Sequence, residues 1–225
     1  MKIKAIITGS TGMVGKGLLL ECLNNEKVES VLIINRKTIG IAHNKLTEVI
    51  HQNMYDLSDI QDQLSDYDVC YFCLGVSAMG LSEKEYKKIT HDLTLNFANT
   101  LLVTSPNITF CYVSGAGTDS TEKGNVMWAR VKGKTENDLL SLGFKKAYMF
   151  RPGYIQPMNG IKSKTAVYNF IYTLISPFYF LMKKLTRYVT STKQMSTAMI
   201  NIVDAQPDIN ILESKDINHF ADKDS

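Results

Sequence analysis

A glycine-rich segment near the start of the chain constrains its fold most strongly. Residues 8–15 read TGSTGMVG, follow an apolar run at 3–7 and precede a helix-like stretch at 18–23. A glycine loop between a strand and a helix lets the backbone approach a pyrophosphate, and the helix start presents free N–H groups to that anion. Glycines also serve ordinary turns, but here the strand and the helix stand where the motif requires them. We expect a dinucleotide to contact seven residues of this loop: Gly9, Ser10, Thr11, Gly12, Met13, Val14 and Gly15.

Strand-like and helix-like segments alternate along most of the chain. After the first strand, further strands are expected at residues 30–35, 45–50, 68–74, 107–114 and 146–150, and long helices at 82–102 and 127–142. Such alternation is typical of a parallel sheet covered by helices on both faces. We therefore predict an α/β fold, a Rossmann-type doubly wound parallel sheet, with a nucleotide-binding domain over residues 1–157. Its ligand crevice should lie beyond the carboxyl ends of the strands.

The alternation ends near residue 151. Residues 154–164 read as loop, 166–185 are rich in apolar side chains around Pro177, 194–203 read as a helix and 210–212 as a short strand. A membrane span needs about 20 predominantly apolar residues, and Pro177 with its polar neighbours weighs against one. We expect residues 158–225 to form a small helical substrate or lid region packed on the same domain, or a dimer face. Contact of residues 166–185 with a membrane surface is the less favoured alternative.

Charge and cysteine usage exclude several classes. The net charge is +3 and the sequence has no Lys/Arg tract, so nucleic acid is not expected as a partner. Cys70 and Cys73 form a C-x-x-C pattern, but in a strand these positions point to opposite faces, so we expect buried thiols. The four histidines have no ligand spacing, and no metal is predicted. Free thiols and the short apolar run before Thr8 suggest a cytoplasmic protein.

The end of the second strand indicates which dinucleotide is bound. In this fold an acidic residue there accepts from the ribose 2′-OH of NAD, whereas cations accommodate the 2′-phosphate of NADP. The chain has Asn35, Arg36 and Lys37 and no carboxylate there, which favours NADP(H). After the third strand, Asp56 is expected either to accept from the adenine amino group or to cap the helix-like stretch that begins at Leu57.

Taken together, these motifs resemble those of the short-chain dehydrogenase/reductase superfamily, in its atypical or extended branch. Within that branch the chain is most similar to Tat-interacting-protein-like NADP-binding proteins and to NAD-dependent epimerase-like proteins. The resemblance covers residues 1 to about 160. It rests on residues 8–15, Asn35-Arg36, Asp56-Leu57, Cys73-Leu74-Gly75, residues 113–117, Val131-Lys132-Gly133 with Glu136, and Arg151-Pro152-Gly153. It implies further cofactor contacts at Leu57, Leu74, Gly75, Lys132 and Pro152.

The resemblance also implies a chemistry, which is hydride transfer to or from the nicotinamide. In the family a tyrosine and a lysine four residues apart perform the proton transfer, and a serine orients the substrate oxygen. By position the serine is Ser114, the lysine is Lys132, and the tyrosine position holds Trp128. An indole N–H only donates and cannot exchange a proton. Other proton sources are therefore considered: Tyr154, Lys132 and a water molecule held by Ser114.

Two functions follow. The chain is expected to be an NADP-dependent oxidoreductase or epimerase-like enzyme that acts on a small carbonyl or hydroxyl compound. The alternative is a non-catalytic NADPH-binding protein with a regulatory role or a protein partner. Turnover of NADPH with a carbonyl compound separates the two, since only the enzyme oxidises its cofactor.

Overall fold

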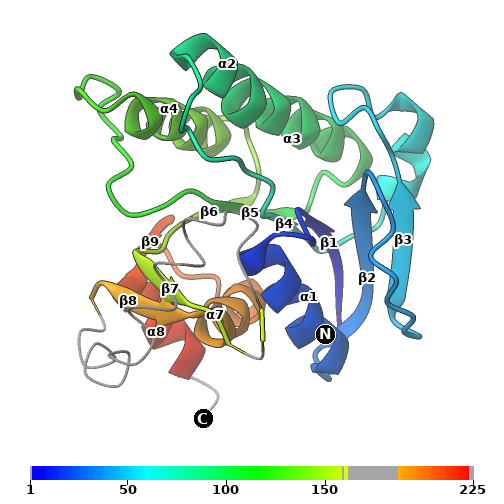
Figure 1. The fold of residues 1–225 in the computed structure, drawn as a ribbon. Helices are drawn as coiled ribbons and strands as arrows, with labels where there is room; N and C mark the ends of the chain where they lie inside the picture. Colours follow the sequence, from blue (N-terminus) through cyan, green and yellow to red (C-terminus); the bar gives the residue numbers. More distant parts are fainter. Residues whose placement is uncertain (1, 159, 162–186, 223–225) are drawn as a thin grey trace.

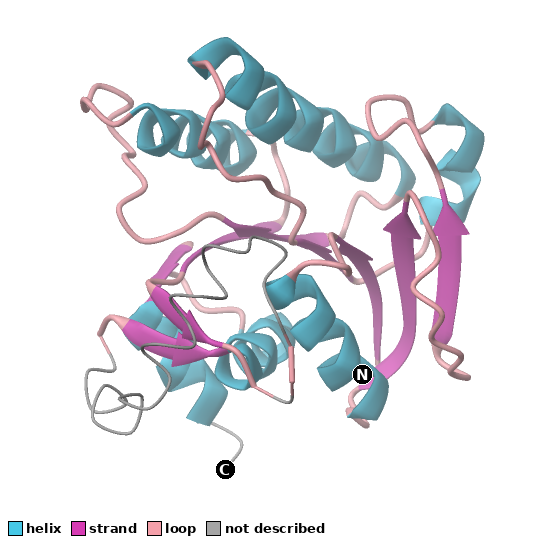
Figure 2. Ribbon diagram, in the orientation of Figure 1, coloured by secondary structure: helices cyan, strands magenta, loops and turns pink. Residues whose placement is uncertain are grey.

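The computed structural model describes residues 2–158, 160–161 and 187–222 (Figures 1 and 2). The apolar segment 166–185, for which a lid or a membrane contact was considered, lies outside the described residues. Among the helices that are described, none is both long enough and apolar enough to cross a membrane.

A seven-stranded sheet forms the centre of the molecule, and every neighbouring pair in it is parallel. The order is β3-β2-β1-β4-β5-β6-β9. Its strands are β1 (Ile3–Thr8), β2 (Val28–Asn35), β3 (Leu46–Ile50), β4 (Val69–Phe72), β5 (Thr109–Val113), β6 (Lys146–Arg151) and β9 (Ile211–Glu213). The order reverses between β1 and β4, which is the switch point where such sheets bind ligands. The predicted Rossmann-type fold is confirmed.

Helices cover both faces of the sheet (Figure 1). On one face lie α1 (Met13–Asn24), α7 (Thr192–Ala205) and α8 (Ser214–Asp222). On the other lie α2 (Glu83–Lys87), a π-helical turn (Lys88–Asp92), α3 (Leu93–Thr104) and α4 (Met127–Ser141), while a 3₁₀ helix (Ser58–Leu64) links β3 to β4. The expected helix at 82–102 is therefore continuous but widened by one π-helical turn. A capping box begins it, because Ser82 and Glu85 exchange hydrogen bonds.

Two apolar cores lie on either side of the sheet. Strands such as β1 and β4 are buried along nearly their whole length, as expected for a parallel sheet covered on both faces. Cys70 packs into the core beneath α3, and Cys73 packs against the core beneath α1 and α7. The two thiols diverge as predicted, and all four cysteines are free. Burial raises the pKa of Cys73 to about 12, which keeps its thiol protonated.

The C-terminal part departs from expectation in two places. Residues 154–164 were predicted to be loop, but β7 (Tyr154–Gln156) pairs in parallel with β8 (Val189–Ser191) in a separate two-stranded sheet. Three-residue strands carry too little periodicity to be recognised in a sequence. Helix α8 was also missed. It buries Ile217, Phe220 and Ala221, while the rest of its sequence is polar. The predicted boundary near residue 157, between the nucleotide-binding domain and the C-terminal region, stays a prediction. Strand β9 of the C-terminal region forms the last strand of the main sheet.

Candidate functional site

A cleft of about 730 Å³ opens at the switch point, beyond the carboxyl ends of β1, β2 and β4. This volume is in the range of cofactor sites. Seven of the predicted cofactor-binding residues line it, namely Gly9, Thr11, Gly12, Arg36, Lys37, Leu74 and Gly75. The lining residues that were not predicted as cofactor contacts are Ile34, Asn35, Gln52, Asn53, Met54, Tyr55, Cys73, Val76, Ile89 and Leu93. The sequence motifs had included Asn35 and Cys73, while Ile34 belongs to β2 and the remaining residues come from loops and from the helix after β4.

The glycine loop has the geometry that an anion site needs. The N–H of Gly12 donates to the carbonyl of Gly9 at 2.8 Å, which closes the turn. Helix α1 then begins at Met13, and Val14 and Gly15 complete its first turn. No side chain caps this helix start and no acidic residue lies in its first turn. Its dipole and N–H groups therefore face an incoming pyrophosphate rather than a carboxylate of the chain itself.

Gly9 is required for this turn on two grounds. Its φ is +69°, and a β-carbon there would lie 2.6 Å from the carbonyl carbon and oxygen of Cys73. Gly40 has nearly the same φ, +68°, but nothing lies within 4 Å of its β-carbon position. An alanine at Gly40 would therefore meet only the cost of the left-handed backbone, whereas an alanine at Gly9 would also meet a clash with the backbone.

We expect Gly40→Ala to cost about 1–2 kcal/mol of unfolding free energy, which is the usual penalty for a left-handed residue. Gly9→Ala should cost at least about 2 kcal/mol more, because the backbone at Cys73, just after β4, must move. Urea unfolding of both variants measures the difference. Equal losses would show that the clash with Cys73 is relieved without cost.

Ser10 faces inward from the loop. It is buried, and its hydroxyl donates to Asn35 Oδ1 at 2.9 Å. This bond joins the glycine loop to the end of β2. Beyond that end, Arg36 and Lys37 are exposed and line the cleft, and Gln52 Nε2 donates to the Arg36 carbonyl at 2.6 Å. No residue lining the cleft, within the described chain, carries a carboxylate. The two cations give this end of the cleft a positive charge that suits an anionic group.

Asp56 and Leu57 do not line the cleft. Asp56 Oδ1 accepts from the Ser58 hydroxyl at 2.7 Å and from the Ser58 N–H at 3.0 Å, which fixes the start of the 3₁₀ helix. These hydrogen bonds lower the pKa of Asp56. Leu57 is buried in the core under α3. Asp56 thus holds the first residue of the 3₁₀ helix, whose N-cap residue is Leu57, while Met54 and Tyr55 of the same loop face the cleft.

Helix α4 carries Trp128 and Lys132 on one face, since they are four residues apart. The Lys132 ammonium donates to the backbone carbonyl of Ser114 at the end of β5. Burial lowers the pKa of Lys132 to about 8, against the opposing effect of the Glu136 carboxylate. The indole of Trp128 is partly buried and lies beside Gly117, where a β-carbon would be 3.5 Å from Trp128 Cη2.

The loop after β5 runs across α4 at Gly133. A β-carbon on Gly133 would lie 1.8 Å from the carbonyl oxygen of Asp119, so only glycine allows this approach. The small residue next to Lys132 is therefore explained by backbone packing. It places the loop that follows Ser114 against the helix that carries Lys132.

The Ser114 hydroxyl is engaged inside the protein. Its Oγ lies 2.5 Å from Glu136 Oε1, to which it donates. The carbonyl oxygen of Phe150 is a second acceptor, 3.2 Å from the same Oγ. Ser114 is 7% exposed and Glu136 is fully buried. Because the hydrogen atom of Ser114 is committed to Glu136, its oxygen can accept from a substrate but cannot donate to one.

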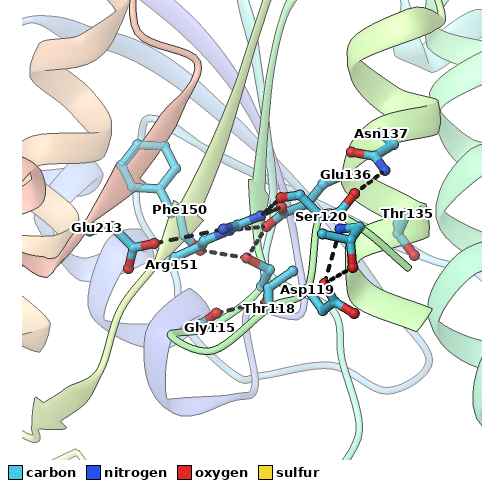
Figure 3. Close-up of polar contacts among 12 residues, drawn as sticks. Gly115, Thr118, Asp119, Ser120, Thr135, Glu136, Asn137, Phe150, Arg151 and Glu213 are labelled. Atoms are coloured by element: carbon cyan, nitrogen blue, oxygen red, sulfur yellow. Dashed lines mark hydrogen bonds and ion pairs between the residues drawn. The ribbon is translucent and has the colours of Figure 1, made fainter. Parts of the chain in front are cut away.

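Glu136, which accepts from this serine, forms a buried ion pair with Arg151 (Figure 3). Arg151 Nε lies 3.1 Å and 3.0 Å from the two Glu136 oxygens, and a second guanidinium nitrogen also donates to the carboxylate. The same guanidinium donates to Ser120 Oγ at 2.5 Å and lies 3.7 Å from Glu213. The pair therefore joins α4, β6, β9 and the loop after β5. The sequence marked both residues by resemblance but gave neither a role.

The two remaining predicted residues lie on the segment after β6. Pro152 is buried, and its carbonyl accepts from the Ala116 N–H at 2.8 Å. Tyr154 lies on β7, and its hydroxyl donates to Gln156 Oε1 at 2.8 Å. Neither residue lines the cleft. In the part of the chain that the structure describes, no three His, Cys, Asp or Glu side chains are grouped to hold a metal ion.

Comparison with known proteins identifies the family. The model of the NAD dependent epimerase/dehydratase family matches residues 5–121, which run from within β1 through the glycine loop and past the end of β5. The chain belongs to this family. It is thus an NAD(P)-binding Rossmann protein, and the resemblance to the atypical short-chain dehydrogenase/reductase superfamily is confirmed.

Curated relatives and solved structures agree with this assignment. Protein fmp52, mitochondrial, of Emericella nidulans is 30% identical over 159 residues, which are 66% of this chain and 65% of that protein. Protein FMP52, mitochondrial, of Meyerozyma guilliermondii is 25% identical over 154 residues, 68% and 65% of the two chains. The chain thus matches just under two thirds of the length of these relatives.

Two solved structures share the fold. The UDP-N-acetylglucosamine 4-epimerase of Methanobrevibacter ruminantium has a TM-score of 0.65 at 17% identity, covering 94% of this chain and 76% of that one. DesIV, a dTDP-glucose 4,6-dehydratase of Streptomyces venezuelae solved with NAD, has a TM-score of 0.67 at 11% identity, covering 97% and 80%. At such low identity these structures establish the fold alone.

The names of the relatives correct one expectation. Both are described as mitochondrial, which contradicts the cytoplasmic location expected from the free thiols. The inference was wrong because buried, protonated cysteines follow from packing in the core. They do not specify a compartment.

Proposed function

We propose that this protein binds NADP(H) in the cleft and catalyses hydride transfer with a small carbonyl or hydroxyl compound, as an oxidoreductase or epimerase-like enzyme. The observation that supports the choice of cofactor is the pair of cations, Arg36 and Lys37, at the end of β2 in a cleft where no described residue contributes a carboxylate. A ribose 2′-phosphate would pair with both cations, whereas the diol of NAD would lack its usual acidic acceptor.

Each part of the cleft has a role in this proposal. The glycine loop and the start of α1 hold the pyrophosphate, Arg36 and Lys37 hold the 2′-phosphate, and Leu74 and Gly75 form the opposite wall. The bound cofactor supplies or accepts a hydride at its nicotinamide. The protein must then supply or remove one proton at the substrate oxygen.

Lys132 is the group that we propose for this proton transfer. Trp128, which stands at the position of the family's tyrosine, has an indole that cannot exchange a proton. The Tyr154 hydroxyl donates to Gln156, and the Ser114 hydroxyl donates to Glu136. The Lys132 amine, with its pKa lowered to about 8, is populated in both protonation states near neutral pH, as a general acid or base requires.

The pH dependence of turnover tests this assignment. Below pH 8 Lys132 carries the proton that reduction consumes, and above pH 8 the amine is neutral, so the rate of carbonyl reduction should fall as pH rises through about 8. Lys132→Met should lower turnover by about 10²–10⁴-fold. Lys134→Met is the matched control, because Lys134 is on the same helix and pairs with Asp138 at the surface. NADPH oxidation followed from about pH 6 to pH 10 gives the profile, and a flat profile or an active Lys132→Met variant would contradict the role.

A non-catalytic NADPH-binding module is the second candidate. Two observations favour it: the hydroxyl of Ser114 is bonded to Glu136, and the residue expected at the tyrosine position is Trp128. In that case NADPH binds but is not oxidised with any of a panel of aldehydes, ketones and quinones. Tight binding without turnover would support this module and refute the enzyme.

A further inference from the structure

The carboxylate of Glu48 lies beside the turn that carries Arg36 and Lys37. Glu48 is on β3, and its Oε1 accepts from Asn35 Nδ2 at 3.0 Å and from the Ile39 N–H at 3.0 Å. Its other oxygen accepts from Thr38 Oγ1 at 2.6 Å. Three donors from β2 and the following turn therefore converge on a single side chain of the neighbouring strand.

Along the sequence, the three donors flank the two cations. Asn35 precedes them, and Thr38 and Ile39 follow them. Arg36 and Lys37 are themselves exposed, which leaves their side chains accessible to an anion. Gln52 holds the turn from the cleft side through the Arg36 carbonyl. A backbone fixed at each end presents its cations in one arrangement and loses less conformational entropy when an anion binds.

The same network reaches the pyrophosphate site. Asn35 donates to Glu48 through its amide nitrogen and accepts from the Ser10 hydroxyl through its amide oxygen. Ser10 belongs to the glycine loop, so one amide side chain links the loop for the pyrophosphate to the turn for the ribose phosphate. In NADP(H) these two anionic groups are joined by a single ribose, and both must be met at a fixed separation.

We propose that Glu48 is a positioning residue that sets selectivity for NADPH over NADH by holding the turn that presents Arg36 and Lys37. The inference rests on the proposed use of NADP(H). Glu48 does not line the cleft, so it acts through the turn rather than on the cofactor. Burial alone would raise its pKa, but the hydrogen bonds from Thr38 and Asn35 hold the pKa below its usual range. The carboxylate is therefore charged near neutral pH and accepts stronger hydrogen bonds than a neutral group would.

Dissociation constants for both cofactors test this inference. In Glu48→Ala the Kd for NADPH should rise about tenfold, while that for NADH changes less than about twofold, because only the 2′-phosphate uses the turn. Glu48→Gln should stay within about threefold of the wild type, since its amide oxygen can still accept from Asn35 and Ile39. Thr47→Ala, at the exposed neighbouring position of β3, is the matched control and should leave both constants unchanged.

The outcomes separate this inference from the proposed function. A wild-type protein without preference for NADPH contradicts the proposed function itself. If the wild-type protein prefers NADPH and Glu48→Ala keeps that preference, only the role of Glu48 is contradicted. The same holds if Glu48→Ala loses affinity for NADPH and NADH equally. If Glu48→Ala does not fold, Thr38→Val removes one of the three contacts at an exposed site and should raise the Kd for NADPH about threefold. Unchanged selectivity in that variant would overturn the inference.

Discussion

Arg151→Met is expected to lower the free energy of unfolding by about 3–5 kcal/mol. The reason is that Glu136 is fully buried and Arg151 is its cationic partner, with hydrogen bonds to both carboxylate oxygens. Removing the guanidinium leaves a buried negative charge that, among the described residues, keeps its hydrogen bond from the Ser114 hydroxyl. Breaking one side of a buried ion pair costs more than the pair itself contributes, since the remaining charge cannot reach water.

Two further variants identify the cause. Glu213→Gln removes the other carboxylate near Arg151, but this side chain is 43% exposed and 3.7 Å away, so it should cost less than about 1 kcal/mol. The double variant Glu136→Met/Arg151→Met should be more stable than Arg151→Met, because the carboxylate that lost its cationic partner is removed as well. Urea unfolding of the three proteins is the measurement. A double variant as unstable as the single one would show that side-chain packing, and not the uncompensated charge, causes the loss.

The second large effect concerns the cofactor. Arg36→Ala/Lys37→Ala should raise the Kd for NADPH about 100-fold, because each cation contributes about 1.5–3 kcal/mol when bonded to a phosphate and the two effects overlap. The Kd for NADH should change less than about threefold, since NADH carries no group at that position. The variant would then no longer prefer NADPH to NADH, although it would still bind a dinucleotide.

Net charge needs its own control in this experiment. Lys145→Ala/Lys146→Ala removes two adjacent cations at the amino end of β6, whereas the cleft lies beyond the carboxyl ends of the strands. It lowers the net charge by the same amount and should leave both dissociation constants unchanged when they are measured at one ionic strength. A parallel loss of NADPH affinity in this control would attribute the effect to the overall field of the protein instead of the turn.

The sequence predicted the parts of the fold that are marked by a strong local sequence pattern. The glycine loop stands between a buried strand and a helix, and the alternation of strands and helices gave the parallel sheet with its crevice at the switch point. The short elements β7 and α8 were missed, because their stability comes from partners far along the chain. For example, β7 pairs with β8, in which Tyr154 lies opposite Val189, 35 residues later in the sequence.

The site was predicted less completely for the same reason. Arg36 and Lys37, which line the cleft, could be proposed from the sequence because they directly follow a strand that ends at the switch point. The role of Glu48 depends on the register of β3 against β2, which no local pattern gives. Likewise, the inward hydrogen bond of Ser114 depends on a glutamate 22 residues later. Asp56 illustrates the reverse case, because its contact with Ser58 is local in the sequence.

The central claim is that the cleft between the glycine loop and the turn after β2 is built for NADP(H). Parallel titrations of the wild-type protein with NADPH and NADH, followed by cofactor fluorescence, test it most directly. We expect NADPH to bind at least about 100-fold more tightly than NADH, as two cations on one phosphate would produce. Equal affinity for the two cofactors, or tighter binding of NADH, would contradict the claim.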